Sequence, residues 1–279
     1  MGEYSGRTAV VTGAGSGLGA AMADLFANAG ANVVLLDIDG ARAEAKAAEL
    51  RGRGVEAIAM GADVADVASV AKAAEATQAK FGSCHVVCAN VGVQQFGAID
   101  KLTAEDWSWV MSVNVMGVIN TVNAFLPLQR ATTGDRHIVL TASSSYFVPG
   151  VRLGAYTTSK YAVVGYGEIL RLELEDEGIN VTLLFPAGMS TRHLESSKLA
   201  RPAELGESVL NMDDIQVMMA SRDMKTETHV ATPEHAVRNL LTELGDKRPY
   251  VISHGAYRTQ IETRQQEVLA SFDRMLANP

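Results

Sequence analysis

A tyrosine and a lysine stand four residues apart at Tyr156 and Lys160, thirteen residues after Ser143. On a helix, residues four apart share one face, one turn apart. A phenol has an unperturbed pKa of about 10, and a neighbouring cation favours the phenolate. We therefore expect Lys160 to lower the pKa of Tyr156 and Ser143 to hydrogen-bond a substrate oxygen. Such a trio suits proton exchange with an alcohol or a carbonyl, although an isolated pair of this spacing is more often a surface contact.

The elements that must position this trio begin with a glycine-rich turn at residues 13–19. The apolar residues 9–12 predict a strand before the turn, and residues 20–30 predict a helix after it. In this context the free N–H groups at the helix start bind a pyrophosphate. Gly13, Gly17 and Gly19 permit backbone conformations closed to other residues and leave out the Cβ atoms that would block a phosphate. The alternative is a flexible turn without a ligand.

A second strand-like run, residues 31–37, ends in the carboxylate of Asp37. Asp37 lies 18 residues after Gly19, near the distance expected for an acid that binds the adenosine ribose hydroxyls. A carboxylate there repels a 2′-phosphate, and neither Ser16 nor Ile38 supplies a cation to bind one. The sequence thus predicts NAD rather than NADP as the cofactor. The alternative for Asp37 is a solvated acid at the end of a strand.

Composition and pattern predict a single α/β domain over residues 1–279. The chain has 279 residues, of which 47% are apolar, and can therefore bury one substantial core. Strand-like runs alternate with amphipathic helices, which indicates a doubly wound parallel sheet. No linker, repeat or low-complexity tract divides the sequence. Further strands are expected near residues 57–60, 85–89, 137–141, 180–185 and 250–252.

Charge and hydropathy argue against several classes of partner. The net charge is −8 and no basic cluster is present, so we expect no nucleic-acid partner. No apolar run approaches the roughly 20 residues that span a membrane. Residues 1–7 lack the apolar region of a signal peptide. A cytoplasmic protein with a small-molecule substrate is the simplest expectation.

The two cysteines, Cys84 and Cys88, lie on a strand-like segment. Residues four apart on a strand point to one face and are too far apart for an unstrained disulfide. A metal site would need further ligands, and His85 is expected on the opposite face. We predict two buried free thiols and no metal site.

These residues together resemble the short-chain dehydrogenase/reductase family, in its single-domain NAD(P)-dependent branch. Thr12 and the glycine turn match the family's TGxxxGxG cofactor motif, and Ser143, Tyr156 and Lys160 match its catalytic residues in order and spacing. The resemblance covers residues 5 to about 190. It implies a Rossmann-type fold, hydride transfer between an alcohol carbon and nicotinamide, and a homodimer or homotetramer built through the helix that bears Tyr156 and the helix before it.

The resemblance also implies roles for residues without a chemical signal of their own. Asn114 looks like the family's active-site asparagine and would hold a water that connects Lys160 to solvent; the alternative is an asparagine at a helix kink. Lys160 would also hold the nicotinamide ribose. Asp63 and Val64 would meet the adenine ring. The implied catalytic set is Asn114, Ser143, Tyr156 and Lys160, and the implied cofactor set is Gly13, Ser16, Gly17, Leu18, Gly19, Asp37, Ile38, Asp63, Val64, Asn90, Gly92, Tyr156, Lys160, Pro186, Gly188, Met189 and Thr191.

Three positions depart from the family pattern. Val91 replaces the usual alanine between Asn90 and Gly92 and is expected to narrow the cleft near the cofactor. Ala187 replaces the glycine after the sixth strand. Tyr146 is bulky where many members carry small residues, and it either shapes a substrate pocket or simply packs.

Substrate specificity is expected to come from residues 93–96, from residues 146–148 and from the segment after Pro186. Residues 190–232 are long and irregular and are expected to form a lid, followed by a helix-strand-helix extension over residues 233–279. Arg192 and His193 either meet a polar end of the substrate or lie in a solvated loop. The tail loosely resembles the bacterial Cα-dehydrogenases of lignin aryl ether breakdown, so we expect an apolar or aromatic secondary alcohol. The alternative function is an NAD(H)-binding regulatory or scaffold protein without turnover.

Overall fold

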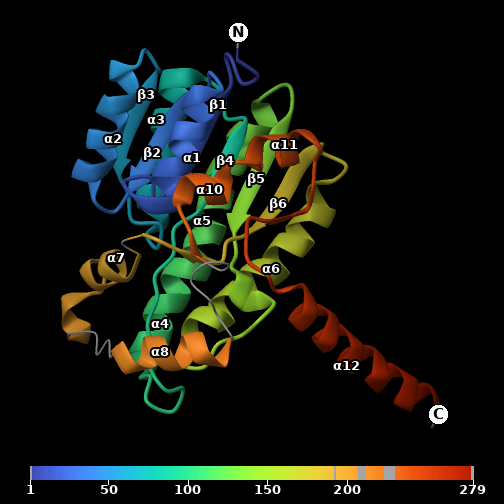
Figure 1. Ribbon diagram of the computed structural model, residues 1–279. Coiled ribbons are helices and arrows are strands. Elements are labelled where there is room, and N and C mark those ends of the chain that lie inside the picture. Colours follow the sequence, from blue (N-terminus) through green and yellow to red (C-terminus); the bar gives the residue numbers. More distant parts are fainter. Residues whose placement is uncertain (1, 192, 207–211, 223–229, 278–279) are drawn as a thin grey trace.

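The structure is a computed structural model that describes residues 2–191, 193–206, 212–222 and 230–277. Seven strands form one parallel sheet in the order β3-β2-β1-β4-β5-β6-β9 (Figure 1). Its strands are β1 (Thr8–Thr12), β2 (Asn32–Asp37), β3 (Ala57–Gly61), β4 (Val86–Ala89), β5 (Arg136–Thr141), β6 (Ile179–Phe185) and β9 (Tyr250–Ile252). A second, two-stranded sheet pairs β7 (Gly188–Met189) with β8 (Val230–Ala231). All seven strands expected from the sequence are confirmed.

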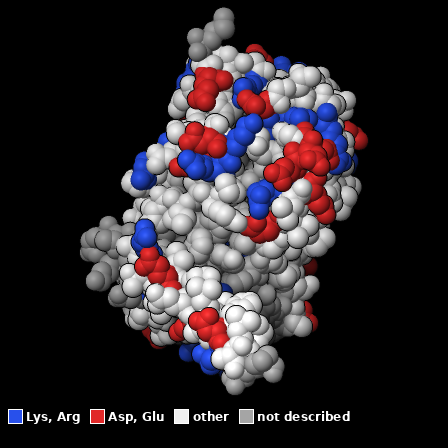
Figure 2. All heavy atoms as spheres, turned by 90° about the vertical axis from the view of Figure 1, so that its right-hand side faces the viewer, with Lys and Arg blue, Asp and Glu red and all other residues white. Residues whose placement is uncertain are grey.

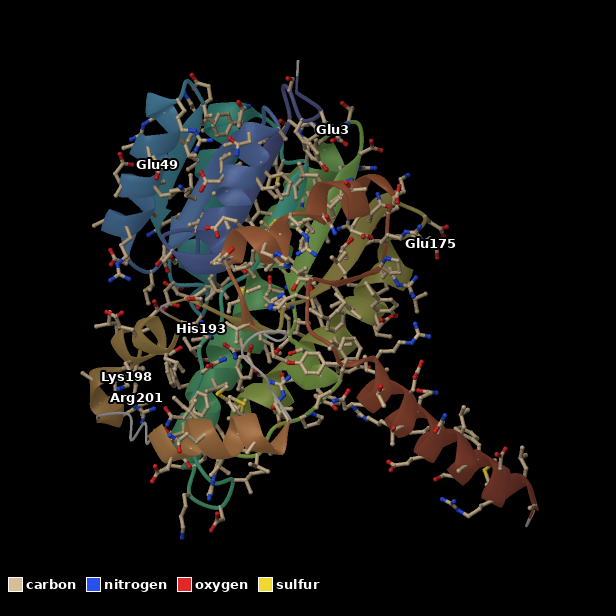
Figure 3. The ribbon with its side chains drawn as sticks, in the orientation of Figure 1. Glu3, Glu49, Glu175, His193, Lys198 and Arg201 are labelled. Carbon is tan, nitrogen blue, oxygen red and sulfur yellow. The ribbon has the colours of Figure 1, made fainter. Side chains whose placement is uncertain are left out.

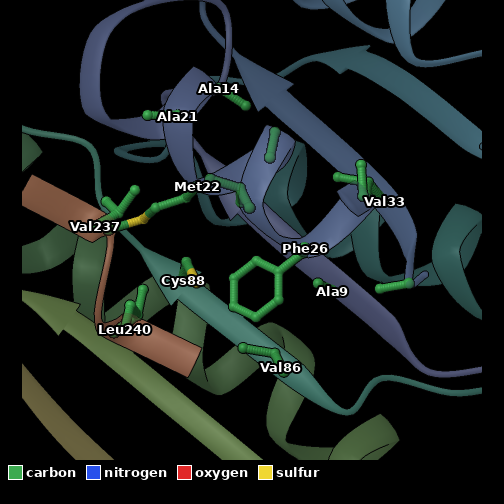
Figure 4. Packing of buried hydrophobic residues seen from close by; sticks show 14 of the residues in the cluster. Ala9, Ala14, Ala21, Met22, Phe26, Val33, Val86, Cys88, Val237 and Leu240 are labelled. Carbon is green, nitrogen blue, oxygen red and sulfur yellow. The ribbon is translucent and has the colours of Figure 1, made fainter. Parts of the chain in front are cut away.

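Helices cover both faces of the large sheet, which explains why its strands read as nearly continuous apolar runs. On one face α1, α2, α10 and α11 pack in a single core cluster, and on the other face lie α3, α5 and α6. Figure 4 shows Met22 and Phe26 of α1 packing beside Cys88 of β4 and Leu240 of α11. The helices of these layers are α1 (Gly17–Asn28), α2 (Gly40–Gly52), α3 (Val67–Phe81), α4 (Ala104–Met111), α5 (Gly117–Ala131), α6 (Gly154–Leu174), α10 (Pro233–Val237) and α11 (Leu240–Gly245). The predicted doubly wound α/β fold is confirmed.

The strand order reverses between β1 and β4. The chain runs outward from β1 to β3 on one side, then returns to β4 and continues outward on the other. Loops that leave neighbouring strands in opposite directions open a crevice at the carboxyl ends of the strands, where doubly wound folds bind their ligands. The glycine turn follows β1 at this point, and Asn90 follows β4.

One long helical stretch runs through α4, a π-helical turn η1 (Ser112–Met116) and α5. It starts with a reciprocal cap, in which Thr103 and Asp106 each accept a hydrogen bond from the other's backbone N–H. Within the described residues, this stretch alone has the length and hydropathy of a membrane span, and 50% of its most apolar window is buried inside the protein. Core helices of globular proteins meet the same criteria, so this stretch does not alter the expectation of no membrane partner.

The segment after β6 forms α7 (His193–Leu199), a 3-10 turn η3 (Ala203–Leu205) and α8 (Met212–Ser221), which lie on one side of the body (Figure 1). The predicted lid also includes residues 192, 207–211 and 223–229, which lie outside the described residues. The last helix, α12 (Arg258–Ala277), extends away from the body, and none of its described side chains is buried.

The two cysteines are buried free thiols, but they do not share a face of the sheet. Cys88 packs with the α1 side and Cys84 with the α3 side. The expectation of one face was wrong because β4 begins only at Val86, so the alternation of a strand does not reach back to Cys84. Burial raises the pKa of both thiols far above the usual range.

Candidate active site

The glycine turn is shaped to admit a bulky anion against its backbone. A Cβ added at Gly19 would lie 2.1 Å from the Gly13 carbonyl oxygen, and Gly17 has a positive φ of 54°. No side chain at these positions blocks the first turn of α1, whose free N–H groups point outward. These features fit a dinucleotide pyrophosphate.

Asp37 closes the far end of this turn. One carboxylate oxygen accepts a hydrogen bond of 2.9 Å from the Gly15 N–H, and the other accepts one of 3.0 Å from the Asp39 N–H. Arg42 lies beside it on α2, where its guanidinium pairs with Asp39 at 3.0 Å. Arg42 was not identified from the sequence, because a cation was sought only at Ser16 and Ile38.

Asn90 ties together the ends of the three central strands. Its backbone N–H donates to Thr12 Oγ1 at 2.9 Å, and its side-chain amide donates to the Thr12 carbonyl at 3.1 Å. Its Oδ1 accepts a hydrogen bond from Thr141 Oγ1 at 3.1 Å. Val91 packs beside the turn, where a Cβ added at Gly13 would lie 3.3 Å from its side chain. The floor of the crevice is therefore fixed by the sheet itself.

The three residues with acid-base chemistry meet at the other end of the crevice. Ser143 follows β5, and Tyr156 and Lys160 lie one turn apart on α6. Lys160 is fully buried; its ammonium donates to the Thr141 carbonyl at 2.8 Å and lies 5.7 Å from the centre of the Tyr156 ring. Burial lowers the pKa of Lys160 to about 8.

The environment of Tyr156 differs from the expected one. Burial raises the pKa of its phenol, whereas hydrogen bonds with Ser143 and Gln94 and the charge of Arg222 lower it. The raising effect of burial dominates, and Lys160 is not among the groups that lower the pKa. The sequence had led us to expect that Lys160 lowers the pKa of Tyr156, because the burial of the phenol depends on the folded chain.

Asn114 is buried beside the site rather than on the wall of the cleft. It lies in the π-helical turn η1; its Oδ1 accepts from the Val93 N–H at 2.7 Å, and its amide donates to the Val93 carbonyl and to Ser159 Oγ. A Cβ added at Gly92 would lie 3.3 Å from the Lys160 ammonium and 3.6 Å from Asn114 Oδ1. Asn114 therefore stands at a distortion of the helix and also beside Lys160.

A single cleft of about 910 Å³ runs from the glycine turn and Asp37 to Ser143, Tyr156 and Lys160. Apart from Asn114, every residue of the expected catalytic and cofactor sets lines it. The wall beyond Tyr156 is mostly apolar and includes Phe96, Leu153, Ile215 and Met218. Tyr146 and the two residues after it do not line the cleft. Tyr146 packs against aromatic rings that include Phe185, which resolves the two alternatives for this residue.

Two residues from the segment after β6 reach the substrate side of Tyr156. Figure 3 places His193 where α7 faces the body, with Lys198 and Arg201 farther along the segment. The His193 ring centre lies 6.5 Å from that of Tyr156, and burial together with the Lys160 charge lowers the pKa of His193 to about 4. Arg222, beyond the end of α8, also lines the cleft. Arg192 lies outside the described residues.

No group of three metal-ligating side chains occurs within residues 2–191, 193–206, 212–222 and 230–277. His85 is held by the sheet, where its Nδ1 accepts from the Thr8 N–H at 3.1 Å.

Comparison with known proteins agrees with this geometry. The family model described as short chain dehydrogenase matches residues 7–202. A C alpha-dehydrogenase from Sphingobium sp. strain SYK-6 is 32% identical over 282 residues, which cover 100% of this chain and 90% of that protein. A short chain dehydrogenase/reductase from Burkholderia phymatum, solved in complex with NAD, has a TM-score of 0.87 and 31% identity over 97% of each chain. A metagenomic short-chain oxidoreductase solved with NADP has a TM-score of 0.63 and 31% identity, over 66% of this chain and 84% of that one. With two thirds of its length matched by the family model and its whole length by a relative, this chain belongs to the short chain dehydrogenase family of oxidoreductases.

Proposed function

We propose that this protein is an NAD-dependent dehydrogenase that transfers hydride between nicotinamide and a secondary alcohol or ketone. The observation that carries the proposal is the convergence of Ser143, Tyr156 and Lys160 at one end of the cleft that has the glycine turn and Asp37 at its other end. NAD, when bound there, supplies the hydride acceptor. The relative from Burkholderia phymatum, which was solved with NAD, supports this reading.

Each polar residue has a role in this proposal. Tyr156 takes the hydroxyl proton at its Oη during oxidation and returns it during reduction. Ser143 orients the substrate oxygen and stabilises the charge that develops on it. Lys160 holds the nicotinamide ribose, and Asn114 supports a water that connects Lys160 to solvent. The remaining cofactor residues hold the dinucleotide from the glycine turn to Thr191, which lies 3.6 Å from a Cβ built at Gly17.

NAD rather than NADP is the proposed cofactor. The carboxylate of Asp37 at the end of β2 would repel a 2′-phosphate on the adenosine ribose, and Arg42, a cation of the cleft wall, is already paired with Asp39. Comparing kcat/KM for the two cofactors tests this choice, since NADP at parity or better would contradict it.

The proposed substrate is an apolar or aromatic secondary alcohol. The apolar wall near Tyr156 and the likeness to a C alpha-dehydrogenase support it. Residues 190–232 are proposed to act as a lid, because Leu194, Ile215 and Met218 from that segment line the cleft. Measuring NADH formation with benzylic, alicyclic, steroid and sugar alcohols tests the assignment. Activity confined to sugars would contradict the substrate class, and NADH binding without turnover across the panel would contradict the enzyme itself.

A homodimer or homotetramer in the cytoplasm completes the proposal. Ile169 and Leu172 on the outer side of α6 are 56% and 57% exposed, as expected of an apolar contact between subunits. The two free thiols suit a reducing compartment. On the face drawn in Figure 2, acidic and basic side chains of the described residues are interspersed, so these residues form no continuous basic patch there of the kind that binds nucleic acid. Light scattering that reports a monomer would contradict the assembly.

A further inference from the structure

A buried arginine stands on the substrate side of the cleft, and the roles given above do not use it. Arg222 follows the last residue of α8, and its relative exposure is 6%. Its methylene groups rest on Gly150, where an added Cβ would lie 2.8 Å from Arg222 Cδ. The position is therefore built to hold this long side chain inside the protein.

The guanidinium of Arg222 has few partners among the residues that the structure describes. One Nη donates to Ser144 Oγ at 2.9 Å, and the group lies 5.4 Å over the centre of the Tyr257 ring. Its Nε has no hydrogen-bond partner, and no carboxylate of the described residues forms an ion pair with the guanidinium. Burial of a charge without a counter-charge is strongly unfavourable, so buried charges are normally paired. A guanidinium on a cleft wall that forms no ion pair with the described residues is available to pair with an anionic ligand.

The surroundings indicate which anion it is. Arg222 hydrogen-bonds the residue next to Ser143, and its charge acts on Tyr156, so it belongs to the reacting end of the cleft. The neighbouring wall is apolar and includes Leu153 and Met218. A guanidinium matches the planar geometry of a carboxylate. A phosphate would call for more donors than this apolar wall provides.

We propose that the substrate carries a carboxylate that pairs with Arg222, so that the enzyme acts on hydroxy acids or keto acids with an apolar or aromatic body. This inference rests on the proposed function, because it names the substrate class of the same site. The guanidinium of Arg222, on the cleft wall, donates to the carboxylate, while Tyr156 and Ser143 bind the alcohol oxygen.

Calorimetric binding to the protein–NADH complex tests the proposal without turnover, with 3-phenylpropanoate compared with 3-phenylpropanamide. We expect the acid to bind about 10- to 100-fold more tightly, as charge-assisted hydrogen bonds do. In Arg222→Met this difference should disappear.

Arg152→Met is the matched control, because it removes a partly exposed cation that is paired with Asp214 of α8. In this variant the preference for the acid should persist. Equal binding of acid and amide to the unaltered protein would overturn the proposal, even if Arg222→Met did not fold. An equal loss of both ligands in Arg222→Met would also overturn it, because it would show a purely structural role.

Kinetics then separate this inference from the proposed function. The rate of NADH formation from 3-hydroxy-3-phenylpropanoate should exceed that from its methyl ester, chiefly through KM. Equal oxidation of acid and ester would overturn the carboxylate preference and leave the dehydrogenase intact. Acid-selective binding with no oxidation of any alcohol would support the anion site and contradict the dehydrogenase.

Discussion

The two ends of the cleft are held in place by different means. At the nucleotide end, hydrogen bonds fix the glycine turn to the end of β2. The Ala14 N–H donates to the Leu36 carbonyl, and the Gly15 N–H donates to the Asp37 carboxylate. At the substrate end, side chains attach the segment after β6 to the body. Arg201 forms a buried ion pair of 2.7 Å with Asp106. The sheet thus fixes where a dinucleotide lies, whereas a few polar contacts decide the shape of the substrate pocket.

The largest effect on this contrast is expected from a side chain that fills the space beside the glycine turn. Gly19→Val would place a side chain against the Gly13 carbonyl, 2.1 Å from the Cβ position. We expect NADH affinity, measured by fluorescence titration, to fall by about 100-fold or more, as overpacking costs suggest. Gly52→Val is the control, because nothing lies within 4 Å of its Cβ position. Unaltered NADH binding in Gly19→Val would place the dinucleotide elsewhere.

A second change tests the far end of the nucleotide site. Asp37→Ser removes the carboxylate that would bind the ribose hydroxyls, so the ratio of kcat/KM for NAD to that for NADP should fall by about 10- to 100-fold. Asp39→Ser sharpens the test, because it releases Arg42 from its ion pair and should improve the use of NADP alone. If the ratio of kcat/KM for NAD to that for NADP stays constant in both variants, Asp37 and Asp39 do not determine the choice of cofactor.

At the substrate end, Arg201→Met should weaken the attachment of the segment after β6 to the body and leave the glycine turn unchanged. The Arg201 and Asp106 side chains are 8% and 9% exposed, so breaking the pair leaves a buried carboxylate and should lower the free energy of unfolding by about 3–5 kcal/mol. The KM for the alcohol should rise while NADH affinity stays constant. Combining Arg201→Met with Asp106→Asn should recover part of the stability, as chemical denaturation can show, because the amide oxygen can still accept the Thr103 N–H of the helix cap without a buried charge. An unchanged KM for the alcohol would show that the ion pair between Arg201 and Asp106 does not contribute to substrate binding.

The smallest expected effect concerns the acidity of Tyr156. Burial raises the pKa of the phenol, and the hydrogen bond with Gln94 opposes that rise, so Gln94→Leu should raise the pKa further. Oxidation needs the phenolate, so its kcat/KM rises with pH, and the half-maximal point of that rise should move to higher pH. The falling limb for ketone reduction, which needs the neutral phenol, should move in the same direction. A shift to lower pH would contradict the assigned contact.

The same contrast explains what could be predicted from the sequence. The glycine turn and Asp37 act through local backbone geometry, so their types and spacing indicate a nucleotide site. Arg222 meets Ser144 across 78 positions, and Arg201 meets Gln95 across 106. No local pattern encodes such contacts, because they depend on how the segment after β6 folds back. The pKa of Tyr156 was likewise misjudged, since burial is a property of the packed chain.

Tyr156→Phe tests the central claim most directly, because it removes one oxygen atom and retains the ring. The phenol is proposed to carry the proton, so kcat/KM should fall by about 100- to 10,000-fold, while NADH affinity stays as in the unaltered protein. Near-normal turnover of an alcohol by this variant would contradict the account.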